Sequence, residues 1–149
     1  MSQQSILTAI YEHLNPAASV GTTFKTAFGG TTTTRGRIYQ AQATRDTPLA
    51  LCVFRVTSEA TTGYLGSAVT STHDLALQVE MFFSLVVGVA TAMASEDRLF
   101  DLLHDQVIVS ADSGVGGIVA RCTARGTPTI FEDAVSVTAE YRIVASKRS

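Results

Sequence analysis

The strongest pattern in the chain is an alternation of apolar and polar residues that starts at Asp74 and changes to helical spacing after Gly88. In the first part every second residue is large and apolar: Leu75, Leu77, Val79, Met81, Phe83 and Leu85. This period of two places the apolar side chains on one face of a β-strand. In the second part the apolar residues fall at helical spacing: Val89, Met93, Leu99, Phe100, Leu103 and Val107. The stretch up to Val109 therefore predicts a strand and then a helix folded back over the sheet, with a potential internal helix start at Ser95-Glu96-Asp97.

A second amphipathic pattern predicts a short helix from Ser5 to Leu14. Its continuous apolar face carries Ile6, Leu7, Ile10, Tyr11 and Leu14. The helix should end at Asn15-Pro16, because the residue before a proline avoids helical backbone angles. His13 lies at the polar edge of the last turn, where the helix dipole favours an imidazole, so we expect a solvated histidine there.

Four more stretches have the apolar residues and flanking turns of strands: residues 37–43, 49–56, 118–125 and 135–145. Residues 49–56 are apolar on both sides, which is typical of a central strand. The last stretch alternates, so one of its faces belongs to the core and the other is wet or covered by a neighbour.

Two long polar segments, residues 17–35 and 57–73, are predicted as loops because they are rich in Ser, Thr and Gly. The first holds a potential short strand near Phe24 to Phe28. Its Gly29-Gly30-Thr31-Thr32 run is not a phosphate loop, because the Gly-Lys-Ser/Thr ending and the strand-then-helix frame are missing.

These elements predict one α+β domain over residues 1–149. We expect a mixed, mostly antiparallel sheet of about 4–6 strands with two helices packed on one face. A chain of 149 residues can bury a core without disulfides, and its apolar share of 46% and charged share of 16% are globular values.

The formal net charge of −2 argues against a dedicated nucleic-acid surface. The basic candidates are Arg35 and Arg37 beside Tyr39, and a second pair, Arg121 and Arg125, on one strand. Four positions along a strand return to the same face, so we interpret the second pair as an intersubunit or solvated surface. The positive mean hydropathy favours some apolar surface that other subunits cover.

The two cysteines, Cys52 and Cys122, both fall within predicted strands and are expected to be free buried thiols. The N-terminus lacks the pattern of a signal peptide, and the apolar run from Leu85 to Ala90 is too short to span a bilayer. We expect the chain to be made in a reducing cytosol.

The residues form no pattern that predicts catalysis, a cofactor or a metal. The carboxylates are scattered apart from Glu132-Asp133, the chain has no Gly-x-Ser-x-Gly elbow, and its histidines and cysteines lack ligand spacing. The best enzyme candidate is Thr72-His73-Asp74, which we interpret as a polar turn that leads into a strand. Glu80, Glu140 and Arg142 lie on the outer faces of two strands, where they are expected to pair across the sheet and orient a neighbouring subunit.

Several local sequences resemble the tail terminator, or tail completion, proteins of tailed phages. The resemblance covers residues 5–145 and rests on the element order together with three segments: Thr47-Pro48-Leu49-Ala50-Leu51, Asp74-Leu75-Ala76-Leu77-Gln78-Val79-Glu80-Met81-Phe82 and Glu140-Tyr141-Arg142-Ile143. The chain departs from that family in its threonine-rich segment from Gly21 to Thr34.

The resemblance implies a phage virion structural protein with no enzymatic activity and no cofactor. Such proteins are α+β subunits that form a hexameric ring on the end of the tail tube, stop its polymerisation and join it to the head connector. The implied partners are the chain itself, the tail tube protein and the head–tail connector protein, with no membrane and no specific nucleic-acid binding, although DNA passes through the ring. The implied location is the head-proximal end of the virion tail, after assembly in the host cytoplasm.

The resemblance fixes no interface motif, so the interface candidates come from the strand faces and loops: Arg35, Arg37, Tyr64, Leu65, Glu80, Glu140 and Arg142. Two alternatives remain open. One is a head–tail adaptor or another tail-tube-related structural protein, and the other is a small enzyme that uses His73 and Asp74.

Overall fold

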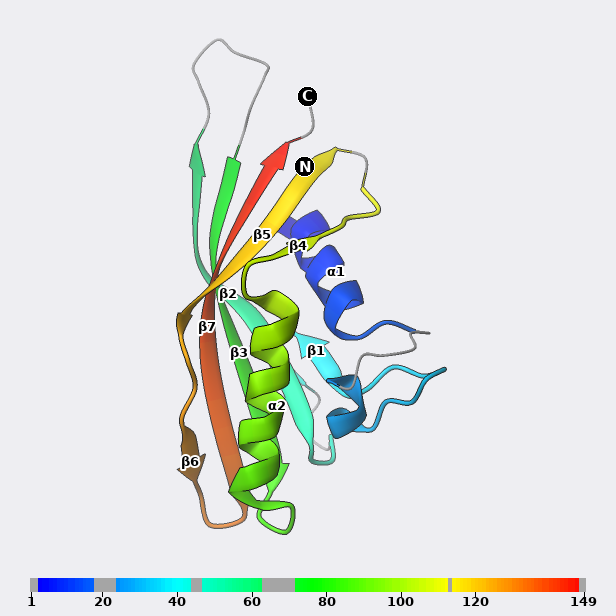
Figure 1. The fold of residues 1–149 in the computed structure, drawn as a ribbon, viewed down its shortest axis with the longest axis vertical. Coiled ribbons are helices and arrows are strands. Elements are labelled where there is room, and N and C mark those ends of the chain that lie inside the picture. Colours follow the sequence, from blue (N-terminus) through cyan, green and yellow to red (C-terminus); the bar gives the residue numbers. More distant parts are fainter. Residues whose placement is uncertain (1–2, 18–23, 44–46, 63–71, 113, 148–149) are drawn as a thin grey trace.

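The computed structural model describes residues 3–17, 24–43, 47–62, 72–112 and 114–147 (Figure 1). In chain order the elements are α1 (Gln3–Leu14), the short 3₁₀ helix η1 (Lys25–Phe28), β1 (Ile38–Gln40), β2 (Leu51–Thr62), β3 (Thr72–Ser84), α2 (Gly88–Leu103), β4 (Gln106–Ile108), β5 (Val115–Ala124), β6 (Pro128–Ile130) and β7 (Ala134–Lys147). The α+β prediction is confirmed.

The described strands form one mixed sheet in the order β1-β2-β3-β7-β5-β4, with β6 paired to β7. Only the β1–β2 pair is parallel. β3 and β7 are the central strands and pair along their whole length, from Thr72 opposite Ser146 to Ser84 opposite Ala134. β2 lies next to the edge strand β1 and is not central as its apolar composition predicts, although Leu51, Cys52, Val53 and Phe54 are all buried.

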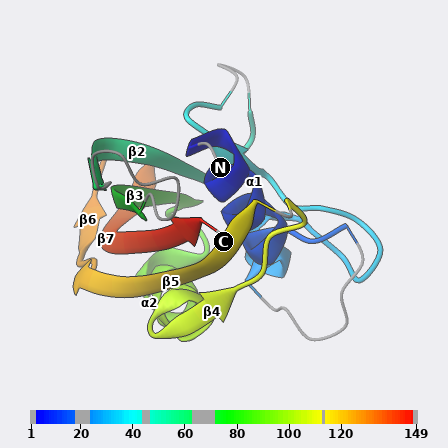
Figure 2. The same cartoon turned by 90° about the horizontal axis from the view of Figure 1, so that it is seen from above.

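Both helices lie on one face of the sheet, as predicted (Figures 1 and 2). The alternation in β3 sends Leu75, Leu77, Val79, Met81 and Phe83 into a continuous core under α1 and α2. The matching alternation in β7 contributes Val135, Val137, Ala139, Tyr141, Ile143 and Ala145 to that core. The remaining face of the sheet, which we call the open face, is covered by neither α1 nor α2.

The buried stripe of α2 differs from the predicted one. Its buried residues are Ala92, Ser95, Glu96, Leu99 and Leu103, while Met93 is exposed. Met93 is one position from Ala92 and therefore points about 100° away around the helix. The helix runs without interruption through Ser95-Glu96-Asp97 and ends at Leu103, just before Asp105 takes a positive φ of 56°. Val107 consequently lies in the edge strand β4 and is exposed.

The hairpin of β2 and β3 is longer than predicted. Residues 57–62 and 72–73, predicted as loop, are strand, since cross-strand backbone hydrogen bonds form whether or not the side chains are apolar. Tyr64 and Leu65 lie outside the described residues.

The structure differs from the sequence-based predictions in three smaller respects. Residues 24–28 form a buried 3₁₀ turn and not a strand, and the strand predicted over 37–43 shortens to β1. His13 is half-buried, with Nε2 2.8 Å from the carbonyl oxygen of Leu102, and so is not a solvated surface histidine. The three-residue strands β4 and β6 were too short to give a detectable alternation.

Candidate interaction surfaces

A polar arm, residues 29–36, projects from the side of the molecule on which the helices lie (Figures 1 and 2). It follows η1 and leads through Arg37 into β1. Its tip is made by four exposed threonines, Thr31 to Thr34. The arm belongs to the segment that the sequence predicts as a loop.

The tip is a turn closed by its own hydroxyls. The N–H of Thr31 donates to the carbonyl of Thr34 over 3.1 Å, and the two hydroxyl oxygens of these residues lie 2.7 Å apart. The N–H groups of Thr33 and Thr34 both donate to the hydroxyl of Thr31. Within the described part of the chain, the hydrogen bonds of the tip run between its own residues, so its shape does not depend on the body of the subunit.

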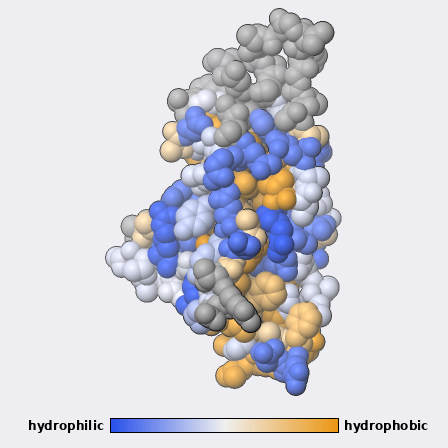
Figure 3. Space-filling model, turned by 180° about the vertical axis from the view of Figure 1, so that it is seen from behind, coloured by the Kyte–Doolittle hydropathy of each residue, from blue (hydrophilic) through white to orange (hydrophobic). Residues whose placement is uncertain are grey.

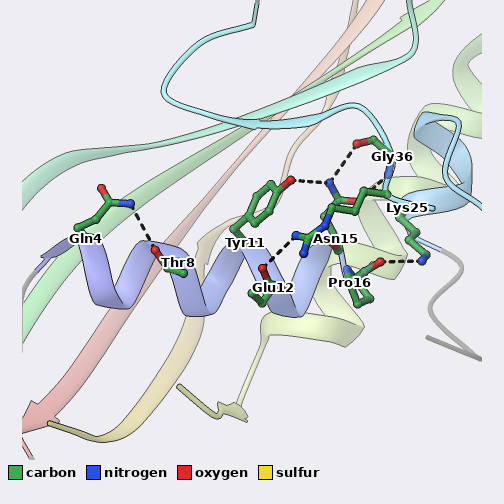
Figure 4. A network of polar contacts seen from close by, with 9 residues as sticks. Gln4, Thr8, Tyr11, Glu12, Asn15, Pro16, Lys25 and Gly36 are labelled. Carbon is green, nitrogen blue, oxygen red and sulfur yellow. Dashed lines mark hydrogen bonds and ion pairs between the residues drawn. The ribbon is translucent and has the colours of Figure 1, made fainter. Parts of the chain in front are cut away.

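Asn15, at the end of α1, fixes the base of the arm (Figure 4). Its Nδ2 donates to the carbonyl of Gly36 over 3.0 Å, and its Oδ1 accepts the N–H of Gly36 over 2.7 Å. The side chain is fully buried. One buried amide thus pairs both backbone groups of Gly36, and its loss would take the acceptor from the N–H of Gly36, while the carbonyl would still accept the N–H of Ile38 over 2.9 Å.

Lys25 and two glycines form the neck of the arm. The carbonyl of Lys25 accepts the N–H of Gly30 over 3.0 Å. The side chain of Lys25 is buried, and its ammonium donates to the carbonyl of Pro16 over 2.7 Å. A Cβ on Gly36 would lie 2.6 Å from the carbonyl oxygen of Lys25, and a Cβ on Gly30 would lie 2.9 Å from the nitrogen of Gly36. The two sides of the neck are therefore so close that only glycine fits.

Arg35 and Arg37, both predicted interface residues, contact the body of the subunit. Arg35 Nη1 lies 3.0 Å from Glu12 Oε1, and its guanidinium sits over the ring of Tyr11. The Glu12 carboxylate holds the pKa of Arg35 above its ordinary value. Arg37 Nε donates to the carbonyl of Ala50 over 2.9 Å. Among the described side chains no carboxylate forms an ion pair with Arg37.

The open face carries charged residues in pairs that join neighbouring strands. Arg55 of β2 lies 2.5 Å from Glu80 of β3, and Arg142 of β7 lies 2.5 Å from Asp74 of β3. The predicted cross-sheet pairing of Glu80 with Glu140 or Arg142 is wrong, because the register places Thr138 opposite Glu80. The Arg142 guanidinium holds the pKa of Asp74 below its ordinary value.

A hollow of about 490 Å³ crosses the open face where small residues lie between these charged ones. Ser58 and Ala60 of β2 and Ala76 of β3 contribute to its lining together with Asp74 and Arg142. Glu140 is two residues from Arg142 and therefore on the same face. It is exposed, and no described side chain forms an ion pair with it.

Exposed apolar residues gather at the end of the molecule where two turns meet, and we call this the apolar end. The register brings these turns together, since Ser84 pairs with Ala134 and the N–H of Phe131 donates to the carbonyl of Ala134 over 2.8 Å. The exposed residues are Leu85, Val86, Val87, Ile130 and Phe131. Figure 3 shows hydrophobic residues at this end. An exposed cluster of this kind is typical of a surface that a partner covers.

The best enzyme candidate from the sequence is not assembled into a site. His73 Nδ1 lies 2.5 Å from Glu59 Oε1 on the helix side of the sheet, where Gln3 also donates to Glu59 over 2.7 Å. Asp74 faces the other way, toward Arg142. Adjacent strand residues point to opposite faces, so His73 and Asp74 do not converge.

Arg121 and Arg125 do not share a face, contrary to the prediction. Arg121 Nε lies 3.2 Å from Asp105 Oδ1, whereas Arg125 binds Glu96 on α2. The register of β5 shifts between Cys122 and Ala124, and one extra residue in a strand reverses the alternation beyond it. The sequence contains no signal for such a shift.

Cys52 and Cys122 are free thiols, as predicted, but only Cys52 is buried and Cys122 is half-buried. Burial raises the pKa of both. No group of three or more His, Cys, Asp or Glu side chains is placed to hold a metal ion in the described ranges. Neither α1 nor α2 has the length and apolar character needed to cross a bilayer.

The chain is thus an α+β protein with helices on one sheet face, a polar open face on the other, a projecting arm and an apolar end. No protein-family model and no curated protein sequence matches it. A chain from the virion of a native gene transfer agent particle has the same fold, with a TM-score of 0.60 over 96% of this chain and 96% of that chain at 17% sequence identity. A second solved chain, which carries only an identifier as its name, has a TM-score of 0.55 over 96% of each chain at 18% identity. The shared fold extends over nearly the whole chain.

The sequence analysis placed Arg35 of the arm among its interface candidates but did not predict the shape of the arm, and it missed the apolar end. Apart from Arg35 the arm consists of glycines and threonines, which predict a loop but give no sign of a fixed shape. The apolar end depends on strand register, because its two turns are more than forty residues apart in the sequence.

Proposed function

We propose that this protein is a structural subunit of a phage-like virion, and specifically a tail terminator. In this role six copies form a ring on the head-proximal end of the tail tube, stop its polymerisation and join it to the head connector. The observation that carries the proposal is the shared fold with a virion chain over 96% of both chains. The local sequences that resemble tail terminators support the same role.

The surfaces of the molecule are consistent with assembly. A closed ring of identical subunits uses two different patches on each subunit that complement one another. The arm and the open face are two such patches, and the apolar end is a third surface, which remains for the tube or the connector. No described residues converge into a catalytic arrangement that competes with this role.

The test has two parts. Light scattering coupled to size exclusion should give a mass about six times that of the 15.8 kDa chain, and negative-stain microscopy should show rings. Added to the polymerising tube protein of the same particle, the chain should then cap the tubes and shorten them. A protein that stays monomeric both alone and with tubes, and leaves tube length unchanged, would overturn the proposal. If rings bind only to the isolated head connector, the chain is a head–tail adaptor instead.

A further inference from the structure

The arm is built more rigidly than its own subunit requires. Asn15 and Lys25 are fully buried polar residues, and two glycines allow a neck that no side chain would fit. Burying an amide and an ammonium is unfavourable unless each is hydrogen-bonded, and here those bonds hold the neck. Yet the four threonines that this neck holds in place make no polar contact with the described body. Within the described part of the chain, the tip is therefore left available for a contact with another molecule.

We propose that the tip of the arm, Thr31 to Thr34, binds in the hollow on the open face of a second copy of this chain. Repeated from copy to copy, this contact joins the subunits head to tail. The inference deepens the proposed function and rests on it, since a ring needs such a contact between unlike surfaces.

The chemistry of the two surfaces favours this occupant. The tip is uncharged and lacks aromatic groups, so it has none of the features with which proteins bind nucleic acid. Each threonine hydroxyl both donates and accepts a hydrogen bond. Asp74, Arg142 and Ser58 are among the residues that line the hollow, and their side chains can together accept and donate hydrogen bonds. Because Asp74 and Arg142 already neutralise each other, an uncharged polar occupant suits the hollow better than a charged or apolar one.

The charges beside the two surfaces are also complementary. Arg37, at the base of the arm, has no carboxylate partner among the described side chains, and Glu140, beside the hollow, has no described cationic partner. In a single subunit these two residues belong to different surfaces. Between two subunits they supply opposite charges on either side of the contact, which fixes its orientation.

The placement of the surfaces suits a repeating contact. The arm projects on the helix side of the sheet, whereas the open face is turned away from the helices (Figure 2). A subunit that receives an arm on its open face therefore still presents its own arm to the next copy. Such a heterologous contact closes into a ring when the rotation between copies allows it.

Cross-linking between two separately purified variants tests the contact directly. In a Cys122→Ala background, Thr32→Cys places a thiol on the tip and Ala76→Cys places one in the hollow. Mixed and treated with a short bis-maleimide, these two variants should give a cross-linked dimer on a denaturing gel. The matched control replaces Ala76→Cys by Ala94→Cys, on the exposed surface of α2, and should give at least about tenfold less dimer. Equal cross-linking to both positions would overturn the proposal.

A charge variant separates this inference from the proposed function. Thr32→Glu with Thr33→Glu brings negative charge toward Asp74 and Glu140 of the neighbour and should weaken self-association by at least about tenfold. Measured at a concentration low enough that the wild type is also monomeric, the free energy of unfolding should stay unchanged, because the tip makes no polar contact with the described body. The control, Ala94→Glu, should associate like the wild type. Rings that persist in the tip variant would overturn the arm contact but leave the terminator role intact, whereas a wild-type chain that neither associates, cross-links nor caps tubes would overturn both.

Discussion

Arg125 binds both carboxylate oxygens of Glu96, with Nε 2.7 Å from Oε1 and Nη2 2.6 Å from Oε2. Glu96 lies on the buried side of α2 and is 5% exposed, while the Arg125 side chain is 44% exposed. The guanidinium also lies 4.1 Å from the ring centroid of Phe100. The two carboxylates beside it, Glu96 first and then Asp97, hold the pKa of Arg125 above its ordinary value. The pair fastens α2 to the segment between β5 and β6.

Removing this arginine should destabilise the fold more than removing another surface arginine. Arg125→Ala leaves the Glu96 carboxylate buried without its cation, and we expect a loss of about 2–3 kcal/mol, lower than for a fully buried pair because the arginine is partly exposed. Urea denaturation followed by circular dichroism measures the change. Arg98→Ala, on the exposed side of α2, is the matched control and should stay within about 0.5 kcal/mol of the wild type. Equal effects of the two substitutions would show that the pair contributes little.

The neck of the arm should tolerate no Cβ. Gly36→Ala puts a methyl group 2.6 Å from the backbone oxygen of Lys25, so the neck must open, at a cost of about 1–3 kcal/mol. Gly117→Ala is the control, because nothing lies within 4 Å of its added Cβ. Urea denaturation measures the stability of both variants. Hydrogen exchange at the N–H of Gly36, which donates a hydrogen bond to Asn15, reports whether the neck has opened. If Gly36→Ala unfolds like Gly117→Ala and keeps this amide protected, the neck is not as tight as described.

The sequence predicted the parts of this fold that depend on local pattern. The alternation in 75–85 and 135–145 identified β3 and β7, and the helical spacing after Gly88 identified α2. These two strands are central, so one face of each is fully buried and the alternation is clean. The end of α1 was also predictable, because the residue before Pro16 avoids helical backbone angles.

The missed features depend on contacts between distant residues. Residues 57–62 are strand because β3 pairs with them, although the side chains of 57–60 are exposed and three of these four are polar. The fixed shape of the arm depends on Asn15, which is sixteen residues before the first threonine of the tip and carries no local sign of this role. The shift beyond Cys122 separates Arg121 from Arg125, and no residue type marks it.

Acid should weaken the link between the two central strands. Because Arg142 lowers the pKa of Asp74 in the folded state, the unfolded chain binds the proton more readily. The stabilisation is therefore present above the ordinary carboxyl pKa of about 3.9 and is lost as the pH falls through the lower folded value. Asp74→Asn removes this titration. Its melting temperature relative to wild type should be lower at pH 6, and the difference should shrink as the pH is lowered to about 3. A difference that does not change with pH would contradict this assignment.

The two thiols should differ in reactivity. Cys52 is fully buried on β2, and burial raises the pKa of its thiol. A reagent therefore has little access to the sulfur, and little of the thiol is in the reactive thiolate form. Cys122 is half-buried, and its pKa is raised for the same reason. In the native protein iodoacetamide should modify Cys122 slowly and Cys52 only at the rate of unfolding. Mass spectrometry of peptides over time, with Cys122→Ala as the control that isolates Cys52, measures both rates. Rapid modification of Cys52 in the folded chain would mean that β2 opens locally.

Substitution at the apolar end tests whether this surface serves binding to a partner and not the stability of the fold. Val86 lies in the turn after β3 and is 95% exposed, so folding removes little of its surface from water. Val86→Asp should therefore leave the free energy of unfolding within about 0.5 kcal/mol of the wild type. It should nevertheless reduce retention on a hydrophobic-interaction column and, if this end contacts the tube, abolish capping. Val107→Asp, on the exposed edge strand β4, supplies the same change away from this end and should cap tubes normally. Capping by Val86→Asp at the wild-type level would place the tube contact elsewhere on the subunit.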